Sequence, residues 1–121
     1  MIVNQIEWVS KEAQEALLFV GDGEYECVAF SHPCHFDKGY ALIEPVLAFS
    51  AQGIMLSQET KVSITRKGEF FAHEVVGILS GFNPTIISVG NIRIELEDAL
   101  PGGIKQNDIV QFYCGRLDVI R

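Results

Sequence analysis

The most regular pattern in this chain is the strict alternation of apolar and charged residues in Ile92-Arg93-Ile94-Glu95-Leu96-Glu97. Successive side chains of a β-strand point to opposite faces of its sheet, so the alternation predicts a strand with one buried and one solvated face. Other short apolar runs are separated by dipeptides that are typical of tight turns. The pattern predicts an all-β protein with at most one or two short helices. The length of 121 residues predicts a single domain over residues 1–121.

Turn signals predict three hairpins. Asp22-Gly23 separates the apolar segments 16–20 and 25–30, and an Asx-Gly pair readily takes the positive φ angles of a type I′ turn. Gly90-Asn91 separates two apolar segments in the same way, and a looser third hairpin is predicted around Arg66-Lys67-Gly68. Together these hairpins predict a meander of antiparallel strands.

Two regions allow less specific predictions. Residues 40–43, 46–49 and 54–56 are rich in apolar residues and are expected to be extended, with Gly53 in a turn before the last of them. The segment from Ser10 to Ala16 is open between a strand and a short helix, because Ser10 could cap a helix and apolar residues recur at helical spacing.

The segment around Gly115 predicts a bent closing strand. Apolar residues alternate up to Cys114 and resume at Leu117, so the inward-facing parity changes across Gly115. A glycine at such a change is typical of a β-bulge, which bends a strand while both halves keep facing the core. The positions expected to be buried in this strand and in the alternating segment are Ile92, Ile94, Leu96, Val110, Phe112, Cys114, Leu117 and Val119.

Four segments in the second half of the chain share the strand pattern of a known fold. They are Val76-Gly77-Ile78-Leu79, the Gly90-Asn91 hairpin, the strand from Ile92 to Glu97 and the closing segment from Asn107 to Phe112. In this pattern the chain resembles the oligonucleotide/oligosaccharide-binding (OB) barrel, and strongly bent strands are how small sheets curl into barrels. The resemblance implies a small barrel or barrel-like sandwich of OB type with a groove for a ligand, and it assigns a function to no single residue.

Charge and cysteine content restrict the classes of partner and the compartment. The net charge is −7, so most of the surface repels polyanions, and nucleic-acid affinity comes largely from neutralised phosphates. Three cysteines do not form a complete set of pairs, and the first residues lack the basic start and apolar run of a signal peptide, which favours the cytoplasm. The longest uncharged stretch, residues 75–92, is interrupted by glycine and proline and predicts two strands and a turn rather than a membrane span.

The densest group of reactive side chains is Cys27, His32, Cys34 and His35. Thiolate and imidazole are the ligands that zinc prefers, so a metal site is one hypothesis for this group. Zinc sites, however, pair ligands as C-x2-C or H-x3-H, and an extended backbone would direct His32 and Cys34 to one side and His35 to the other. We therefore expect no metal or other cofactor, with Cys27 packed as a small apolar residue. Cys34 beside His32 or His35 is the candidate for thiol chemistry.

The candidates for ligand binding are Arg66, Phe70 and Phe71, because aromatic rings beside cations can stack on the bases of single-stranded nucleic acids. His73 lies in a predicted strand and is expected to be partly buried and hydrogen-bonded. The alternating carboxylates Glu95 and Glu97 are expected on the solvent side. The sequence contains no phosphate-binding glycine loop or nucleophile elbow, so we assign no catalytic residue.

These observations favour a noncatalytic binding or interaction module whose ligand the sequence does not identify. An apolar fraction of 48% with positive mean hydropathy predicts apolar surface that a partner covers, most simply in a twofold homodimer. The uncharged segment 46–56 is expected to form that contact through Leu47, Phe49, Ile54 and Met55. A single-stranded nucleic-acid-binding protein and a small metal- or thiol-dependent enzyme are the alternatives.

Overall fold

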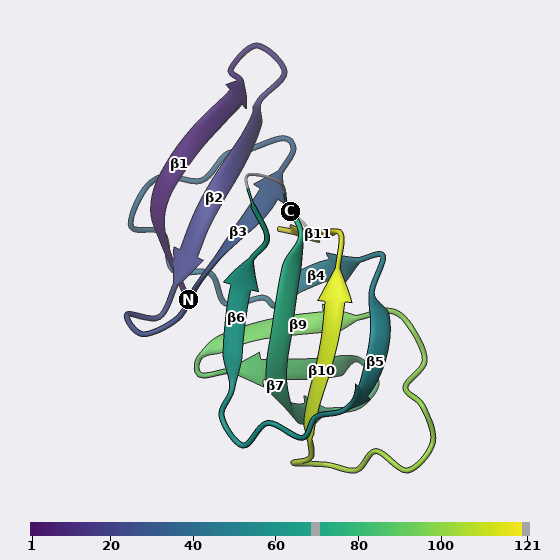
Figure 1. The fold of residues 1–121 in the computed structure, drawn as a ribbon. Helices are drawn as coiled ribbons and strands as arrows, with labels where there is room; N and C mark the ends of the chain where they lie inside the picture. Colours follow the sequence, from purple (N-terminus) through teal and green to yellow (C-terminus); the bar gives the residue numbers. More distant parts are fainter. Residues whose placement is uncertain (69–70, 120–121) are drawn as a thin grey trace.

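In the computed structural model, which describes residues 1–68 and 71–119, the chain is all-β and forms eleven strands without a helix (Figure 1). The strands are β1 (Ile2–Ser10), β2 (Glu15–Gly21), β3 (Glu26–Ser31), β4 (Val46–Phe49), β5 (Gln52–Leu56), β6 (Ser63–Arg66), β7 (His73–Gly81), β8 (Thr85–Val89), β9 (Ile92–Leu96), β10 (Ile109–Cys114) and β11 (Arg116–Asp118). Over the described ranges, no helix is long and apolar enough to cross a membrane.

All eleven strands belong to one mixed, open sheet. The strand order is β1-β2-β3-β11-β4-β9-β8-β7-β10-β5, with β6 paired to β7 beside this path. A barrel requires its first and last strands to pair, whereas here β1 and β5 stand at opposite ends of the order. The described strands therefore form an open sheet, and the expected closed barrel of OB type is not observed. Figure 1 shows the meander β1–β3 standing to one side of the curved remainder of the sheet.

The segment that could have been a helix is the turn of the first hairpin. β1 ends at Ser10, β2 begins at Glu15, and the two strands pair in antiparallel order. The backbone N–H of Ala13 donates to Oγ of Ser10 at 3.2 Å, so this serine caps a turn instead of a helix.

The hairpin predicted at Asp22-Gly23 is confirmed, although its turn type is different. Gly21 and Glu26 are the last paired residues, so the loop has four residues and not two. Gly23 has a φ of 96°, whereas Asp22 has no positive φ, which excludes a type I′ turn. The Asp22 carboxylate instead accepts the backbone N–H groups of Glu24 and Tyr25 at 2.9 and 2.8 Å.

The other two predicted hairpins are also present. Val89 and Ile92 are paired around Gly90-Asn91, which is therefore a two-residue turn, with a φ of 59° at Gly90. β6 pairs with β7, and Arg66 lies opposite His73. The second strand of this hairpin begins at His73.

In the middle of the chain, β4 confirms the extended segment 46–49, whereas residues 40–43 contribute a bridge between Ile2 and Ala41. Gly53 lies inside β5 instead of in the turn before it. Its φ is 64°, and the pairing of β5 with β10 shifts register next to it, as in a bulge.

The change of parity at Gly115 is confirmed and has a topological cause. β10 pairs with β7 and β5 up to Cys114, whereas β11 pairs with β3 in parallel and with β4 in antiparallel order. Gly115 lies between them and donates its N–H to the carbonyl of Phe49 at 3.0 Å. The closing strand thus moves from one set of partners to another at this glycine. All eight positions predicted to be buried are buried.

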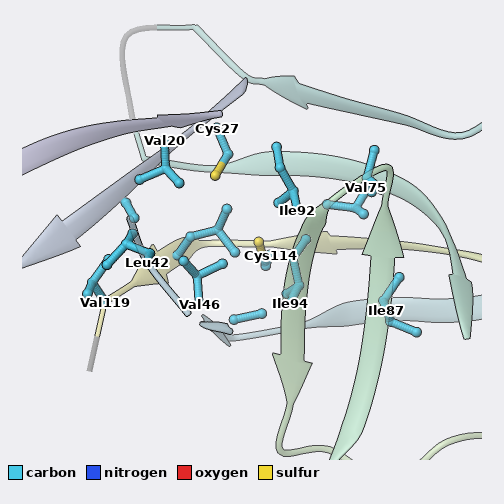
Figure 2. Packing of buried hydrophobic residues seen from close by; sticks show 14 of the residues in the cluster. Val20, Cys27, Leu42, Val46, Val75, Ile87, Ile92, Ile94, Cys114 and Val119 are labelled. Atoms are coloured by element: carbon cyan, nitrogen blue, oxygen red, sulfur yellow. The ribbon is translucent and has the colours of Figure 1, made fainter. Parts of the chain in front are cut away.

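The buried side chains form one cluster that reaches from the meander into the curved part of the sheet (Figure 2). Val20 and Cys27 come from the meander, while Ile87, Ile92 and Ile94 come from β8 and β9. Each strand therefore turns one face inward, and the side chains on these faces form a continuous core that joins the two parts.

Candidate functional site

The four members of the predicted cysteine and histidine group are divided between the core and the surface. Cys27 and Cys34 are both buried, whereas His32 and His35 are exposed. Within the described ranges, no three side chains of histidine, cysteine, aspartate or glutamate are grouped so that they could hold a metal ion. Burial raises the pKa of the Cys27 thiol to about 12, and this residue packs in the core as expected. Cys34, the candidate for thiol chemistry, is buried and packs against the same core, whereas such chemistry needs an exposed thiol.

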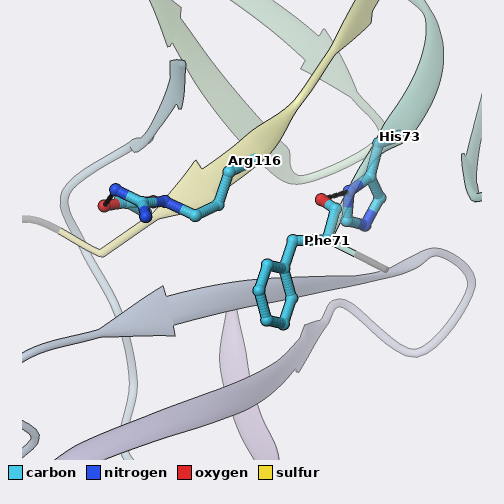
Figure 3. Close-up of polar contacts among 4 residues, drawn as sticks. Phe71, His73 and Arg116 are labelled. Carbon is cyan, nitrogen blue, oxygen red and sulfur yellow. Dashed lines mark hydrogen bonds and ion pairs between the residues drawn. The ribbon is translucent and has the colours of Figure 1, made fainter. Parts of the chain in front are cut away.

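His73 is a structural histidine in the part of β7 next to the meander (Figure 3). Its ring is fully buried, and Nε2 accepts the backbone N–H of Val28 in β3 at 3.2 Å. Nδ1 donates to the carbonyl of Phe71 at 3.0 Å, so the ring is a neutral tautomer that uses both nitrogens. The pKa of His73 is lowered to about 4, chiefly by burial; the bond to Phe71 acts in the opposite direction, and the nearby Arg66 charge adds a smaller lowering. The ring connects β7 to the meander and has no free nitrogen for catalysis.

Next to this histidine, aromatic and charged side chains from distant segments form what we call the aromatic–arginine cluster. It consists of Phe30, Phe49, Phe71, Arg116 and Asp118. The guanidinium carbon of Arg116 lies 4.9 Å from the ring centroid of Phe30 and 5.2 Å from that of Phe49. The rings of Phe30 and Phe71 lie 6.5 Å apart. The contacts therefore run without interruption from Phe49 on β4 to Phe71 before β7.

The charge of the cluster is compensated internally. Nε and Nη2 of Arg116 donate to the two carboxylate oxygens of Asp118 at 2.6 and 2.9 Å. Such a bidentate pair fixes the plane of the guanidinium and suits its stacking on aromatic rings. The phenylalanine rings at positions 49 and 71 each remain 37% exposed. The result is a surface with two exposed aromatic rings and no net charge from its arginine.

The structure separates the residues predicted to bind a ligand or a second copy. Of the ligand candidates, Phe71 belongs to the cluster, Arg66 is half-buried in β6, and Phe70 lies outside the described residues. The expected interface residues divide as follows: Phe49 is in the cluster, Ile54 packs against the core, Met55 is exposed on β5, and Leu47 is half-buried on β4.

Sequence reasoning missed three members of the cluster, namely Phe30, Arg116 and Asp118. A signal was present for two of them, because residues two apart on a strand share a face and Arg116-x-Asp118 places opposite charges there. Nothing in the sequence indicates that β11 lies beside β3 and β4, which is what brings the phenylalanines to this pair.

A hollow of about 590 Å³ lies between the loop after β2 and the β8–β9 hairpin. Two of its polar side chains, Asp22 and Arg93, are already engaged with the backbone. Oδ2 of Asp22 accepts the N–H of Asn91 at 2.8 Å, and Arg93 donates to the carbonyl of Ile43. Burial acts to raise the pKa of the Asp22 carboxyl, but its backbone donors lower it below its usual range. The bond between Asp22 and Asn91 ties the β2–β3 and β8–β9 hairpins together.

A groove of a different character lies over β5, β10 and β7. It consists of two hollows of about 330 and 290 Å³ that share Glu59 and Gln111. Acidic, amide and apolar side chains line it together. Its lining side chains include Gln52, Met55, Leu56, Gln58, Glu59, Glu74, Val76, Gln111 and Tyr113.

No protein-family model, curated protein or solved structure matches this chain.

Proposed function

We propose that the protein is a noncatalytic interaction module that forms a homodimer through the aromatic–arginine cluster. The observation that carries this proposal is the pair of exposed rings, Phe49 and Phe71, held around a charge-compensated Arg116. Exposed aromatic residues and arginine are enriched in protein interfaces and supply much of the binding energy where they are buried on association.

Electrostatics favours a second copy at this surface. Two copies that each carry a net charge of −7 repel one another over most of their surfaces. A contact between them is therefore least costly where charges are compensated within each copy. The Arg116–Asp118 pair meets this condition, and β4 contributes no charged residue to the surface beside it.

The groups with reactive chemistry support a noncatalytic role because they take part in the fold. Burial raises the pKa values of Cys27 and Cys114 to about 12 and about 11, which keeps both thiols protonated at neutral pH. His73 uses both ring nitrogens in the hydrogen bonds described above. Three unpaired cysteines also suit a reducing compartment, so we place the module in the cytoplasm.

A single-stranded nucleic-acid-binding role has weaker support from the same region. Phe71 is exposed near basic residues, as stacking on bases requires. However, Lys67 pairs with Glu74 at 3.2 Å and Arg116 pairs with Asp118, so these cations are matched by carboxylates. A surface that attracts phosphates needs an excess of positive charge, which favours self-association over this alternative.

Multi-angle light scattering at low micromolar concentration tests the proposal. The unmodified protein should have the mass of a dimer, and Phe49→Glu should reduce it to that of a monomer because it buries a charge at the contact. Phe82→Glu is the matched control, since Phe82 is 49% exposed in the turn between β7 and β8 and lies outside the cluster. A monomeric unmodified protein, or a dimer that persists in Phe49→Glu, would refute the proposed contact.

A further inference from the structure

We infer that the groove over β5, β10 and β7 binds a short segment of a partner protein that carries a lysine or arginine next to an apolar residue. The inference extends the proposed role as an interaction module and concerns a second surface, since no residue of the aromatic–arginine cluster lines either hollow.

The larger hollow is suited to a basic side chain. Glu59 and Glu74 both line it, and Tyr113, which is 40% exposed, lines it with them. A cation between two carboxylates gains from both, and an ammonium or guanidinium group over the face of a tyrosine ring gains a further attraction. The half-buried Val76 provides apolar surface for the methylene groups of a lysine or arginine side chain.

The loop that carries Glu59 is held in place over β10. The N–H of Glu59 donates to Oγ of Ser57 at 3.0 Å, and that hydroxyl donates to Oε1 of Gln111 at 2.9 Å. Because Gln111 lies on the strand beneath, this chain of bonds positions the backbone of Glu59 at the rim before any partner arrives. Preorganisation of this kind lowers the entropic cost of binding.

Glu74 is available to a partner although it already has one ion pair. Its bond to Lys67 is between two well-exposed side chains, 59% and 48% of whose surfaces are accessible. Such pairs contribute little to stability, so exchanging Lys67 for a cation of the partner has a small cost. The net charge of −7 further favours the approach of a basic partner.

The smaller hollow is suited to the apolar neighbour. Met55 and Leu56 line it and are each 51% exposed, and it adjoins the first hollow through Glu59 and Gln111. Although β5 is an edge strand, the bulge at Gly53 twists that edge, and bulged edges resist the addition of another strand. The segment is therefore expected to lie on the face of the sheet and not to extend it.

The inference is tested by titrating the ¹⁵N-labelled protein with blocked hexapeptides and following amide chemical shifts. One peptide contains a single Arg-Leu pair flanked by glycine and serine, and two others replace that pair by Gln-Leu or Arg-Ser. The Arg-Leu peptide should shift the amides of Gln111 and Tyr113 and should bind more tightly than either of the other two. Glu59→Gln and Glu74→Gln should each weaken binding roughly three- to fivefold. Glu97→Gln, which removes the same charge from an exposed residue outside the groove, should leave the affinity unchanged.

Shifts with the Gln-Leu peptide as large as with Arg-Leu, or no shifts at millimolar peptide, would overturn the inference. The same titration on Phe49→Glu separates it from the dimer. A monomeric variant that still binds the Arg-Leu peptide would confirm the groove independently of self-association. Dimerisation without peptide binding would support the homodimer contact at the aromatic–arginine cluster and refute peptide binding in the groove.

Discussion

Protonation of His73 should destabilise the fold in mildly acidic solution. The ring is fully buried and neutral, and its Nε2 accepts the N–H of Val28. A proton on Nε2 would remove this acceptor and place a charge in the core beside Arg66, which already lowers the pKa of the ring. Because Val28 belongs to β3 and His73 to β7, the protonated ring would weaken the connection between the meander and the rest of the sheet.

The size and sign of the effect follow from the pKa. It is 6.5 for an ordinary histidine and about 4 for His73, so between these values the unfolded chain binds more protons than the folded one. The stability that the neutral ring provides is therefore complete above about pH 6.5 and is lost as the pH falls through 4. A difference of this size corresponds to roughly 3 kcal/mol of unfolding free energy.

Urea unfolding of the unmodified protein and of His73→Gln between pH 7.5 and 4 measures this contribution. At pH 7.5 the variant should be less stable by about 1–3 kcal/mol, because glutamine cannot reproduce both hydrogen bonds of the ring. The difference should shrink as the pH falls, since the variant lacks the titrating group while both proteins share all their carboxylates. His32→Gln with His35→Gln, which changes two exposed histidines, should keep the slope of the unmodified protein. Parallel pH profiles for His73→Gln and the unmodified protein would refute the reasoning.

Four further substitutions test the packing by denaturant midpoints. Phe112→Ala should lower the free energy of unfolding by about 3–5 kcal/mol because it leaves a cavity in the core, whereas Glu95→Ala should lower it by less than about 0.5 kcal/mol. Equal midpoints for the two variants would contradict the prediction that Phe112 faces the core and Glu95 faces solvent. Gly77→Ala should cost about 1–3 kcal/mol because its Cβ would lie 2.5 Å from Cγ2 of Ile87, and an unchanged midpoint would show that the sheet adjusts freely. Asp22→Ala should also cost about 1–3 kcal/mol, since three backbone N–H groups lose their acceptor, and no loss of stability would exclude it as a link between hairpins.

Features that depend on neighbours in sequence were predictable. The turn at Gly90-Asn91 and the alternation from Ile92 to Leu96 are local, because a two-residue turn and a half-buried strand each have their own residue pattern. The change of facing at Gly115 was predictable for the same reason. The turn after Asp22 was only partly predictable, because its geometry depends on which N–H groups the carboxylate accepts.

Features that depend on distant pairing were not predictable. β4 pairs in parallel with β9, and β11 lies between β3 and β4, although no local pattern distinguishes these partners from others. The expected barrel was not confirmed for the same reason, because closure of a sheet depends on which strands pair at its edges. The aromatic–arginine cluster depends on the same pairings, so only Phe49 and Phe71 were identified beforehand, and for separate reasons.

The position of β11 has a consequence for how the protein is made. These three residues fill the gap between β3 and β4, yet they are translated after both of these strands. Until they leave the ribosome, a nascent chain exposes two unpaired strand borders that can recruit other nascent chains. Pairing strands so far apart in sequence is also slow, because the chain loses the entropy of loop closure before the stabilising contacts form. Synthesis at low temperature or with chaperones should therefore raise the soluble yield more than any change to the finished surface.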